Sequence, residues 1–199
     1  MSLNDDAVLT AALGYVFTAP IGTAAPSPSL LQTIDLEDPS TWTGATGWDS
    51  IGHTSRGEMP EWGFDGGDSE VKGSWQKKKL REITAEDPID YLTIRLHQFD
   101  EDAFNLYYGE NASTTPGIFG VSTKGNKRAE KSFLAVIVDG DERLGFHVPK
   151  ASVKRDDAIQ LPVDDLASLP IRATFLDLEG EPLLFKWINE DLFNVDETP

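Results

Sequence analysis

Cysteine is absent from the 199 residues of the sequence. Its absence excludes disulfide bonds, thiolate metal sites and any cysteine nucleophile. The sequence also has no run of about 18 apolar residues, which a membrane-spanning helix would need. Asp5 and Asp6 stand where a secretory signal would carry a basic segment. We therefore expect no membrane segment, and a protein that stays in the cytoplasm in which it is made.

Basic residues are scarce. The chain has 17 Lys and Arg against 34 Asp and Glu, which gives a net charge of −17. Such an excess of acid opposes tight binding of nucleic acid, because that binding depends on Lys and Arg at the phosphates. The imbalance lies at the ends: residues 1–70 sum to −10, residues 71–155 to +2 and residues 156–199 to −9. The acidic ends and the nearly neutral middle are complementary, either within one subunit or between copies of it.

The length fits a single domain over residues 1–199, because single domains cluster at about 100 to 200 residues. Prolines are frequent after a predicted short strand at 13–17. Pro20, Pro26, Pro28 and Pro39 disfavour a regular helix or a central strand in this region. We expect a proline-rich arm or loop at about 18–42, and a short acidic tail at the C-terminal end.

The remaining pattern is mostly that of β-strands. Leu92, Ile94 and Leu96 alternate with polar residues, and this period of two buries one face of a strand. A hairpin is predicted where the apolar run from 133 meets the turn at Asp139 and Gly140. A second hairpin is predicted from "PIRATFLDL" and "PLLFKWI", joined across "EGE", and one long strand is predicted at 70–83.

One helix is predicted, over "DEDAFNLYYG". Asp100 is its N-cap, Phe104 lies three and four residues before two tyrosines, and Gly109 ends it. About seven or eight strands and one helix predict a mainly β fold, an antiparallel sandwich or open barrel with a flanking α-helix.

No pattern of catalytic or metal-binding residues stands out. The three histidines occur in "GHT", "LHQ" and "FHV", without a second ligand at metal spacing. The acidic clusters lack the spacing of a calcium loop, and neither a nucleophile elbow nor a phosphate-binding glycine motif follows a strand. We therefore expect no cofactor and no metal, and an enzyme is the weakest of the hypotheses.

Tryptophans and lysines concentrate in the stretch 47–79. The five tryptophans of the chain are typical either of anchors in a core or subunit interface, or of a platform for sugar stacking; they are Trp42, Trp48, Trp62, Trp75 and Trp187. The run "KKKLRE" that begins at Lys77 favours a solvated strand face or a subunit contact over DNA binding.

The order of motifs resembles that of a known family. The motifs are "GWDSIGHTSRGEMPEW", then the "KKKLREI" strand, then "LTIRLHQFDEDAFNLYYG" with a strand running into a helix, and finally "VIVDGDERLGFHVPKASV". Together they are similar to the major tail tube proteins of long, non-contractile-tailed bacteriophages, especially those of actinobacterial hosts. The resemblance covers most of residues 10–188.

The resemblance implies a virion protein that is not an enzyme. It implies a β-sandwich or barrel subunit that assembles into hexameric rings, which stack into a hollow tube. DNA passes through that tube, and the tape-measure protein fills it first. It further implies contacts with the tail terminator and with distal tail or baseplate proteins. Family members tend to have an acidic lumen, and the net charge of −17 agrees with this, because an acidic wall repels phosphate.

The candidate contacts between subunits or rings follow from these interpretations. They are Trp48, Trp62, Trp75, Lys77, Lys78 and Lys79. Two other hypotheses stay open at this point: a non-catalytic glycan-binding β-sandwich module, and a virion decoration protein.

Overall fold

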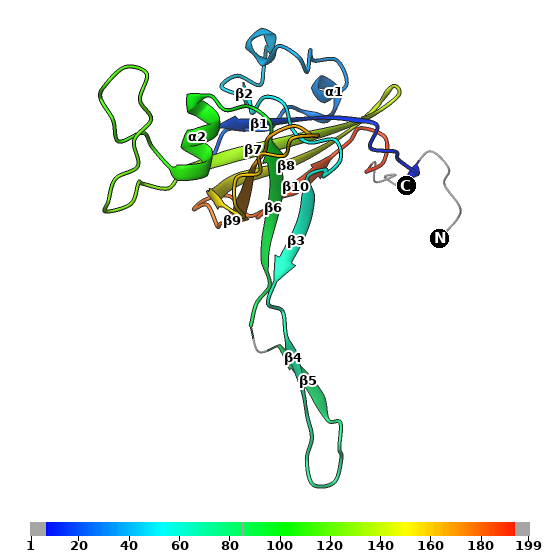
Figure 1. Cartoon of the computed structure of the whole chain (residues 1–199). Coiled ribbons are helices and arrows are strands. Elements are labelled where there is room, and N and C mark those ends of the chain that lie inside the picture. Colours follow the sequence, from blue (N-terminus) through cyan, green and yellow to red (C-terminus); the bar gives the residue numbers. More distant parts are fainter. Residues whose placement is uncertain (1–6, 85, 194–199) are drawn as a thin grey trace.

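A computed structural model describes residues 7–84 and 86–193 of the chain (Figure 1). Its strands and helices, in chain order, are β1 (Leu13–Ala19), α1 (Pro28–Leu31), the 3-10 helix η2 (Pro39–Thr41), β2 (Asp49–Ser50), β3 (Glu61–Asp65), β4 (Ser69–Lys72), β5 (Arg81–Thr84), β6 (Ile89–Leu96), α2 (Glu101–Tyr108), β7 (Glu130–Asp139), β8 (Glu142–Arg155), β9 (Leu169–Phe175) and β10 (Lys186–Ile188). The predicted mainly β, antiparallel fold is confirmed, and α2 is the flanking helix. None of the helices in the described part of the chain is long and apolar enough to cross a membrane.

Eight strands form one antiparallel sheet in the order β2-β1-β7-β8-β9-β6-β3, with β10 paired to β8. The β7–β8 hairpin turns where it was predicted, and Gly140 adopts a positive φ in the turn. β8 is the longest strand, and its edge opposite β7 is shared by two others. β10 pairs with residues Gly145 to His147, and β9 pairs farther along, from Ala151.

The predicted β9–β10 hairpin is therefore wrong. Both strands bind the same edge of β8, one after the other, and do not pair with each other. The segment between them turns at Glu179 and Gly180, but this turn does not join two paired strands. The sequence shows two apolar strands with a short acidic connection, which is also the pattern of a hairpin. Only the length of β8 makes the other pairing available.

The sheet curls into an open barrel that the chain segment after β2 helps to close. β2 pairs with β1 through Ser50 and Phe17. A few residues later, His53 accepts a hydrogen bond at its backbone oxygen from His97, and Thr54 forms a bridge with Leu96 at the end of β6. One short segment thus joins β1, near one edge of the sheet, to β6, near the other edge.

Alternation along the strands separates two hydrophobic cores. Val16 and Ala135 face the inside of the barrel, whereas Phe17 and Leu134 face an outer core. The inner core also contains the predicted face of β6, which is Leu92, Ile94 and Leu96, together with Ile171, Ala173 and Phe175 of β9. A sheet with both faces covered needs apolar residues at successive positions, as in the "SFLAV" run of β7.

The proline-rich segment folds over the outer face of its own sheet. Leu31, Ile34, Leu36 and Trp42 are buried there against β1 and β7. It contains the short helix α1, which the prolines were predicted to prevent. Pro28 is the first residue of α1, where the missing N–H costs nothing, and the Ser27 side chain caps the helix.

Helix α2 begins and ends as predicted. The Asp100 carboxylate accepts a hydrogen bond of 2.9 Å from the backbone N–H of Ala103, and two acidic residues lie in the first turn. Gly109 ends the helix with a φ of 89°. A Cβ at this position would lie 2.4 Å from the Lys127 carbonyl oxygen, so the close approach of the following loop also requires glycine.

The predicted long strand at 70–83 is wrong. Two short strands, β4 and β5, occupy this region and pair with each other only. Trp75 and Gln76 are the two central residues of the tight turn between these strands. Neither is glycine, asparagine or proline, so the sequence lacked the usual signal of a hairpin turn. The predicted acidic tail lies mostly beyond residue 193, outside the described residues.

Candidate assembly surfaces

A two-stranded arm projects far from one end of the barrel (Figure 1). The arm consists of residues 66–84 and 86–88, which leave the barrel after β3 and re-enter it at β6. Every residue of β4 and β5 is exposed, and neither strand pairs with the barrel sheet. The arm therefore gains little from burial within its own subunit.

The end of the arm is a tight turn that presents a tryptophan. Ser74 and Lys77 exchange two backbone hydrogen bonds of 2.7 and 3.1 Å, which places Trp75 and Gln76 at the end of the turn. Trp75 is 99% exposed. A Cβ on Gly73 would lie 2.4 Å from the Lys78 carbonyl oxygen, so glycine is needed where the two strands approach each other. Three other large apolar side chains of the arm are also exposed: Val71, Leu80 and Ile83.

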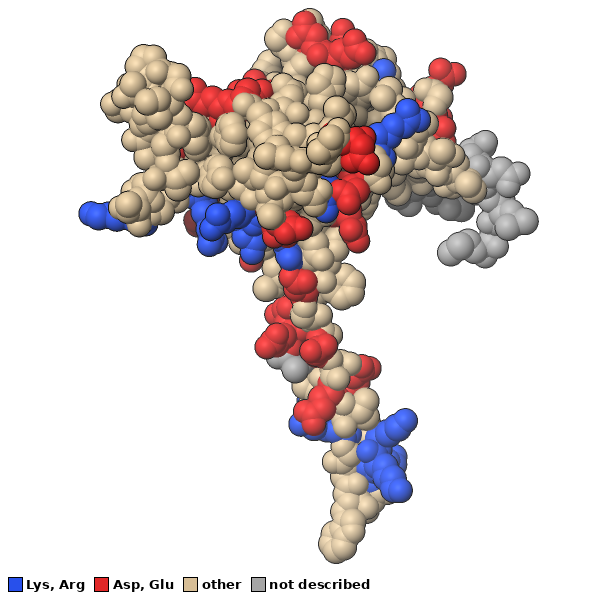
Figure 2. Space-filling model, in the orientation of Figure 1, with Lys and Arg blue, Asp and Glu red and all other residues tan. Residues whose placement is uncertain are grey.

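The arm concentrates positive charge near its end. Residues 72–81 contain five Lys or Arg and no acid, in a chain with a net charge of −17. Figure 2 shows these blue side chains near the end of the arm and red acidic side chains nearer the barrel. Lys72 pairs with Glu70, whereas Lys77, Lys78 and Lys79 form no ion pair with any described residue. The lysines proposed as contacts thus lie together, exposed, beside Trp75.

The structure places Trp48 and Trp62 elsewhere. Trp48 is 3% exposed in the outer core, where its indole N–H donates a 3.2 Å hydrogen bond to the Ala24 carbonyl. Trp62 is half-buried on β3, with its ring 5.4 Å from Phe146 and 5.6 Å from Trp187. Both pack mainly within their own subunit, so our proposal of an intersubunit contact rests on Trp75 and the three lysines.

The tryptophans form no shared platform for a sugar. Trp42 and Trp48 are buried in the outer core, Trp62 and Trp187 lie together at the barrel, and Trp75 stands alone on the arm. Stacking on a glycan requires exposed aromatic faces close together. The described residues therefore offer no support for the glycan-binding hypothesis.

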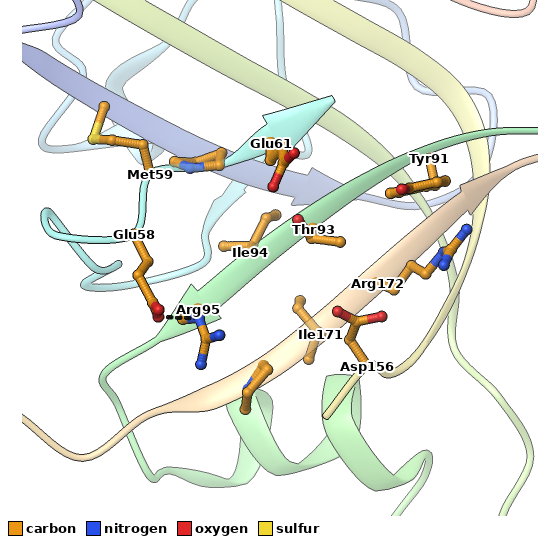
Figure 3. Close-up of a pocket in the computed structure, with 12 residues that line it drawn as sticks. Glu58, Met59, Glu61, Tyr91, Thr93, Ile94, Arg95, Asp156, Ile171 and Arg172 are labelled. Atoms are coloured by element: carbon orange, nitrogen blue, oxygen red, sulfur yellow. Dashed lines mark ion pairs between the residues drawn. The ribbon is translucent and has the colours of Figure 1, made fainter. Parts of the chain in front are cut away.

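A cleft of about 590 Å³ lies over strands β3, β6 and β9 (Figure 3). Arg95 pairs with Glu58 across it, and Arg172 pairs with Asp65. The Arg172 guanidinium also lies 3.5 Å from the centroid of the Tyr91 ring, a cation–π contact. Each of these arginines has a carboxylate partner in its own subunit. The arrangement is typical of a polar outer face of a barrel.

Two of the three histidines have a ring nitrogen bonded to a backbone carbonyl. His97 Nδ1 donates to the Ala167 carbonyl at 2.8 Å, and His147 Nε2 donates to the Thr23 carbonyl at 3.0 Å. Burial lowers the pKa of His147 to about 4, because the charged imidazolium is poorly solvated there; nearby Lys186 also lowers it. No group of three or more His, Asp or Glu within residues 7–84 and 86–193 is placed to hold a metal ion.

Sequence reasoning missed a second exposed feature, the β8–β9 loop (residues 156–168). Three of its large apolar side chains are exposed: Leu161, Val163 and Leu166. Their spacing follows neither a strand nor a helix, and Pro162 and Pro170 lie among or beside them. Apolar residues without periodicity next to prolines were the available signal.

These features define a class of protein, a β-barrel with exposed apolar residues on an arm and a loop that extend from it. A family model described as "Phage tail tube protein" matches residues 1–199, and the chain belongs to that family. It is a structural protein of a phage tail, as the resemblance predicted.

Two relatives specify the match further. The chain is 69% identical to the major tail protein Gp23 of Mycobacterium phage L5 over 199 residues, which cover 100% of this chain and 99% of the relative. It is 70% identical to the major tail protein Gp23 of Mycobacterium phage D29 over 195 residues, which cover 98% and 97% of the two chains. The predicted family, tail tube proteins from phages of actinobacterial hosts, is confirmed.

Proposed function

We propose that copies of this chain assemble into hexameric rings, and that the rings stack into the hollow tube through which the phage DNA is delivered. The observation that carries the proposal is the arm. It holds Trp75 fully in solvent together with three lysines that form no ion pair with any described residue, and no strand of the described barrel sheet pairs with it. Exposed apolar groups on a projection are typical of an interface that another molecule completes.

The charge of the subunit supports passage of DNA rather than its binding. Without the five bases of residues 72–81, the rest of the chain carries −22, because the total is −17. A tube built from such subunits repels phosphate wherever the acidic surface faces the lumen. The arm lysines then belong at contacts between subunits or rings, away from the DNA path.

The proposed partners follow from this role. They are other copies of the chain, the tape-measure protein, the tail terminator and the distal tail or baseplate proteins, with DNA only in passage. The proposed role is structural, without catalysis or a cofactor. Synthesis takes place in the host cytoplasm, and the final location is the virion.

Electron microscopy of the purified protein tests the proposal directly. We expect hollow tubes of stacked rings in negative stain, and fast-sedimenting polymers in the ultracentrifuge. A protein that stays strictly monomeric at high concentration by both methods would contradict it.

A charge reversal tests the arm. Replacing Lys77, Lys78 and Lys79 by Glu should abolish tubes while leaving the circular dichroism spectrum and the melting temperature unchanged, because these side chains are exposed and form no ion pair with any described residue of their own subunit. The control replaces three other exposed bases, Lys124, Lys127 and Arg128, by Glu. It changes the net charge by the same amount. Normal tubes from the arm variant, or equal loss in the control, would remove the arm lysines from the interface.

A further inference from the structure

The β8–β9 loop has a fixed base. Ile159 packs against the inner core of the barrel. Tyr107 on helix α2 donates a 2.7 Å hydrogen bond to the Asp157 carbonyl, and His97 bonds the Ala167 carbonyl. Gln160 and Ser168 form a β-bridge across the neck of the loop. The loop is thus held in place from both sides.

The outer part of the same loop combines exposed apolar surface with negative charge. Leu161 and Leu166 are mostly exposed, and Val163 is fully exposed. Residues 156–168 contain four aspartates and no base, and Asp164 and Asp165 lie between these apolar side chains. A fixed loop that holds three aliphatic side chains in water is typical of an interaction surface.

The end of the arm is complementary to this loop in both respects. It offers exposed Trp75 and Leu80 as apolar partners. It also offers five bases without an acid between residues 72 and 81, against four acids without a base in the loop. Apolar contacts at the centre with opposite charges around them are the usual composition of a specific interface.

The two surfaces lie at opposite ends of the barrel. The arm enters the barrel at Ile89, the first residue of β6. The loop enters it at Leu169, and Leu169 pairs with Leu96, the last residue of β6. A strand of eight residues is about 25 Å long. The arm points away from the loop of its own subunit, so a contact between them joins two copies through different surfaces, and such contacts repeat from copy to copy.

A second acidic loop lies at the same end of the barrel as the arm, opposite the β8–β9 loop. Residues 176–185 contain three acids and no base, with Leu183 exposed. This loop follows Phe175, the last residue of β9, at the end of the barrel from which the arm projects. It therefore serves as the natural comparison for the β8–β9 loop.

We propose that the end of the arm of one copy docks on the β8–β9 loop of another copy. Trp75 and Leu80 pack on Leu161, Val163 and Leu166, while the arm lysines face Asp164 and Asp165. The proposal rests on the proposed function, and it names the surface that receives the arm.

Disulfide trapping tests the contact, because the chain has no cysteine of its own. Gln76→Cys on the arm is combined with Val163→Cys, and the assembled protein is oxidised. We expect a ladder of covalent oligomers larger than dimers, since each copy gives one arm and receives another. The control combines Gln76→Cys with Leu183→Cys and should stay monomeric.

The outcomes separate this proposal from the proposed function. Two results would overturn the docking proposal and leave the tail tube role intact. One is tubes of the Gln76→Cys, Val163→Cys variant that give only monomers or dimers. The other is a ladder from the Gln76→Cys, Leu183→Cys variant and none from the Gln76→Cys, Val163→Cys variant. Failure of the unmodified chain to form tubes bears instead on the proposed function.

Charge exchange gives an independent check. Asp164→Lys with Asp165→Lys should abolish tubes, and adding Lys78→Glu and Lys79→Glu should restore them at the original net charge. Normal tubes from the aspartate variant alone would overturn the proposal, as would tubes that fail to return in the combined variant.

Discussion

The barrel and the arm are both built from antiparallel strand pairs, but they use their apolar side chains differently. In the barrel, β1, β7 and β8 bury both faces, and tryptophans such as Trp42 and Trp48 are almost fully enclosed. In the arm, each residue of the two strands is exposed, and Trp75 lies in solvent. The same residue type therefore stabilises the subunit in one region and is available for contacts in the other.

We therefore expect that the stability of the subunit and its assembly into tubes can be changed separately. A substitution in the barrel changes the free energy of unfolding of the subunit. A substitution in the arm should leave that energy nearly unchanged, because the side chains of the arm strands are exposed in the monomer and their removal gives up little buried surface. Four substitutions follow, from the largest expected change in stability to the smallest.

Trp42→Ala should have the largest effect. The Trp42 ring lies edge-on to Phe17 with centroids 4.7 Å apart, and its indole N–H donates to the Asp35 carbonyl. Removing it leaves a cavity in the outer core and should lower the free energy of unfolding by about 3 to 5 kcal/mol. Urea denaturation followed by circular dichroism measures this. A loss below about 1 kcal/mol would mean that the proline-rich segment contributes little to the fold.

His147→Gln should remove part of the acid sensitivity of the barrel. The folded pKa of His147 is about 4 and its ordinary value is 6.5, so the unfolded chain takes up a proton first as the pH falls. The folded state should therefore lose about 2 to 3 kcal/mol relative to the unfolded state as the pH falls from about 6.5 to 4.5, and keep this stability above pH 6.5. Glutamine keeps a donor for the Thr23 carbonyl and does not titrate.

The difference between wild type and His147→Gln isolates this effect from the many carboxylates. Urea denaturation at pH 7 and at pH 4.5 gives the two free energies for each protein. Equal acid sensitivity of both would show that His147 is protonated in the folded state at an ordinary pKa.

Asp100→Ala should have a smaller effect at the barrel's flank. The change removes the N-cap of helix α2 and its bond to the Ala103 N–H, which should cost about 1 kcal/mol. Asp100→Asn is the matched control, because it keeps the capping oxygen and should restore most of the loss. Thermal melting of the three proteins decides the question, and equal melting temperatures would contradict the role of the cap.

Trp75→Ala should have the smallest effect on stability and a large effect on assembly. Trp75 is 99% exposed, so the free energy of unfolding should change by less than about 0.5 kcal/mol. Tube yield in negative stain should fall sharply. Trp75→Phe retains an aromatic ring and should assemble better than alanine. A clear loss of stability, or full tubes from Trp75→Ala, would break the contrast between arm and barrel.

Local signals in the sequence predicted the elements that local physics controls. The alternation of Leu92, Ile94 and Leu96 identified β6 and its buried face. The cap at Asp100 and the stop at Gly109 located helix α2, and Gly140 located the β7–β8 turn. Each of these features depends on neighbouring residues, which a sequence shows directly.

Long-range pairing could not be predicted in the same way. Nothing local to β10 shows that its partner is β8 rather than β9. The arm was missed for a related reason: Lys77, Lys78 and Lys79 fit a solvated strand face in a barrel as well as a free projection. Trp75 was identified as a candidate contact without its exposure being known, whereas Trp48 carried the same composition signal and is buried.

The register between β6 and β9 has a mechanical consequence. The arm is attached to the first residue of β6, and the β8–β9 loop is attached to the first residue of β9. Because the two strands are antiparallel over Tyr91↔Thr174 to Leu96↔Leu169, these attachments lie at opposite ends of the pair. Tension between docked copies would pull the strands past each other in shear. All of the paired residues would then resist together, instead of separating one hydrogen bond at a time as a zipper does.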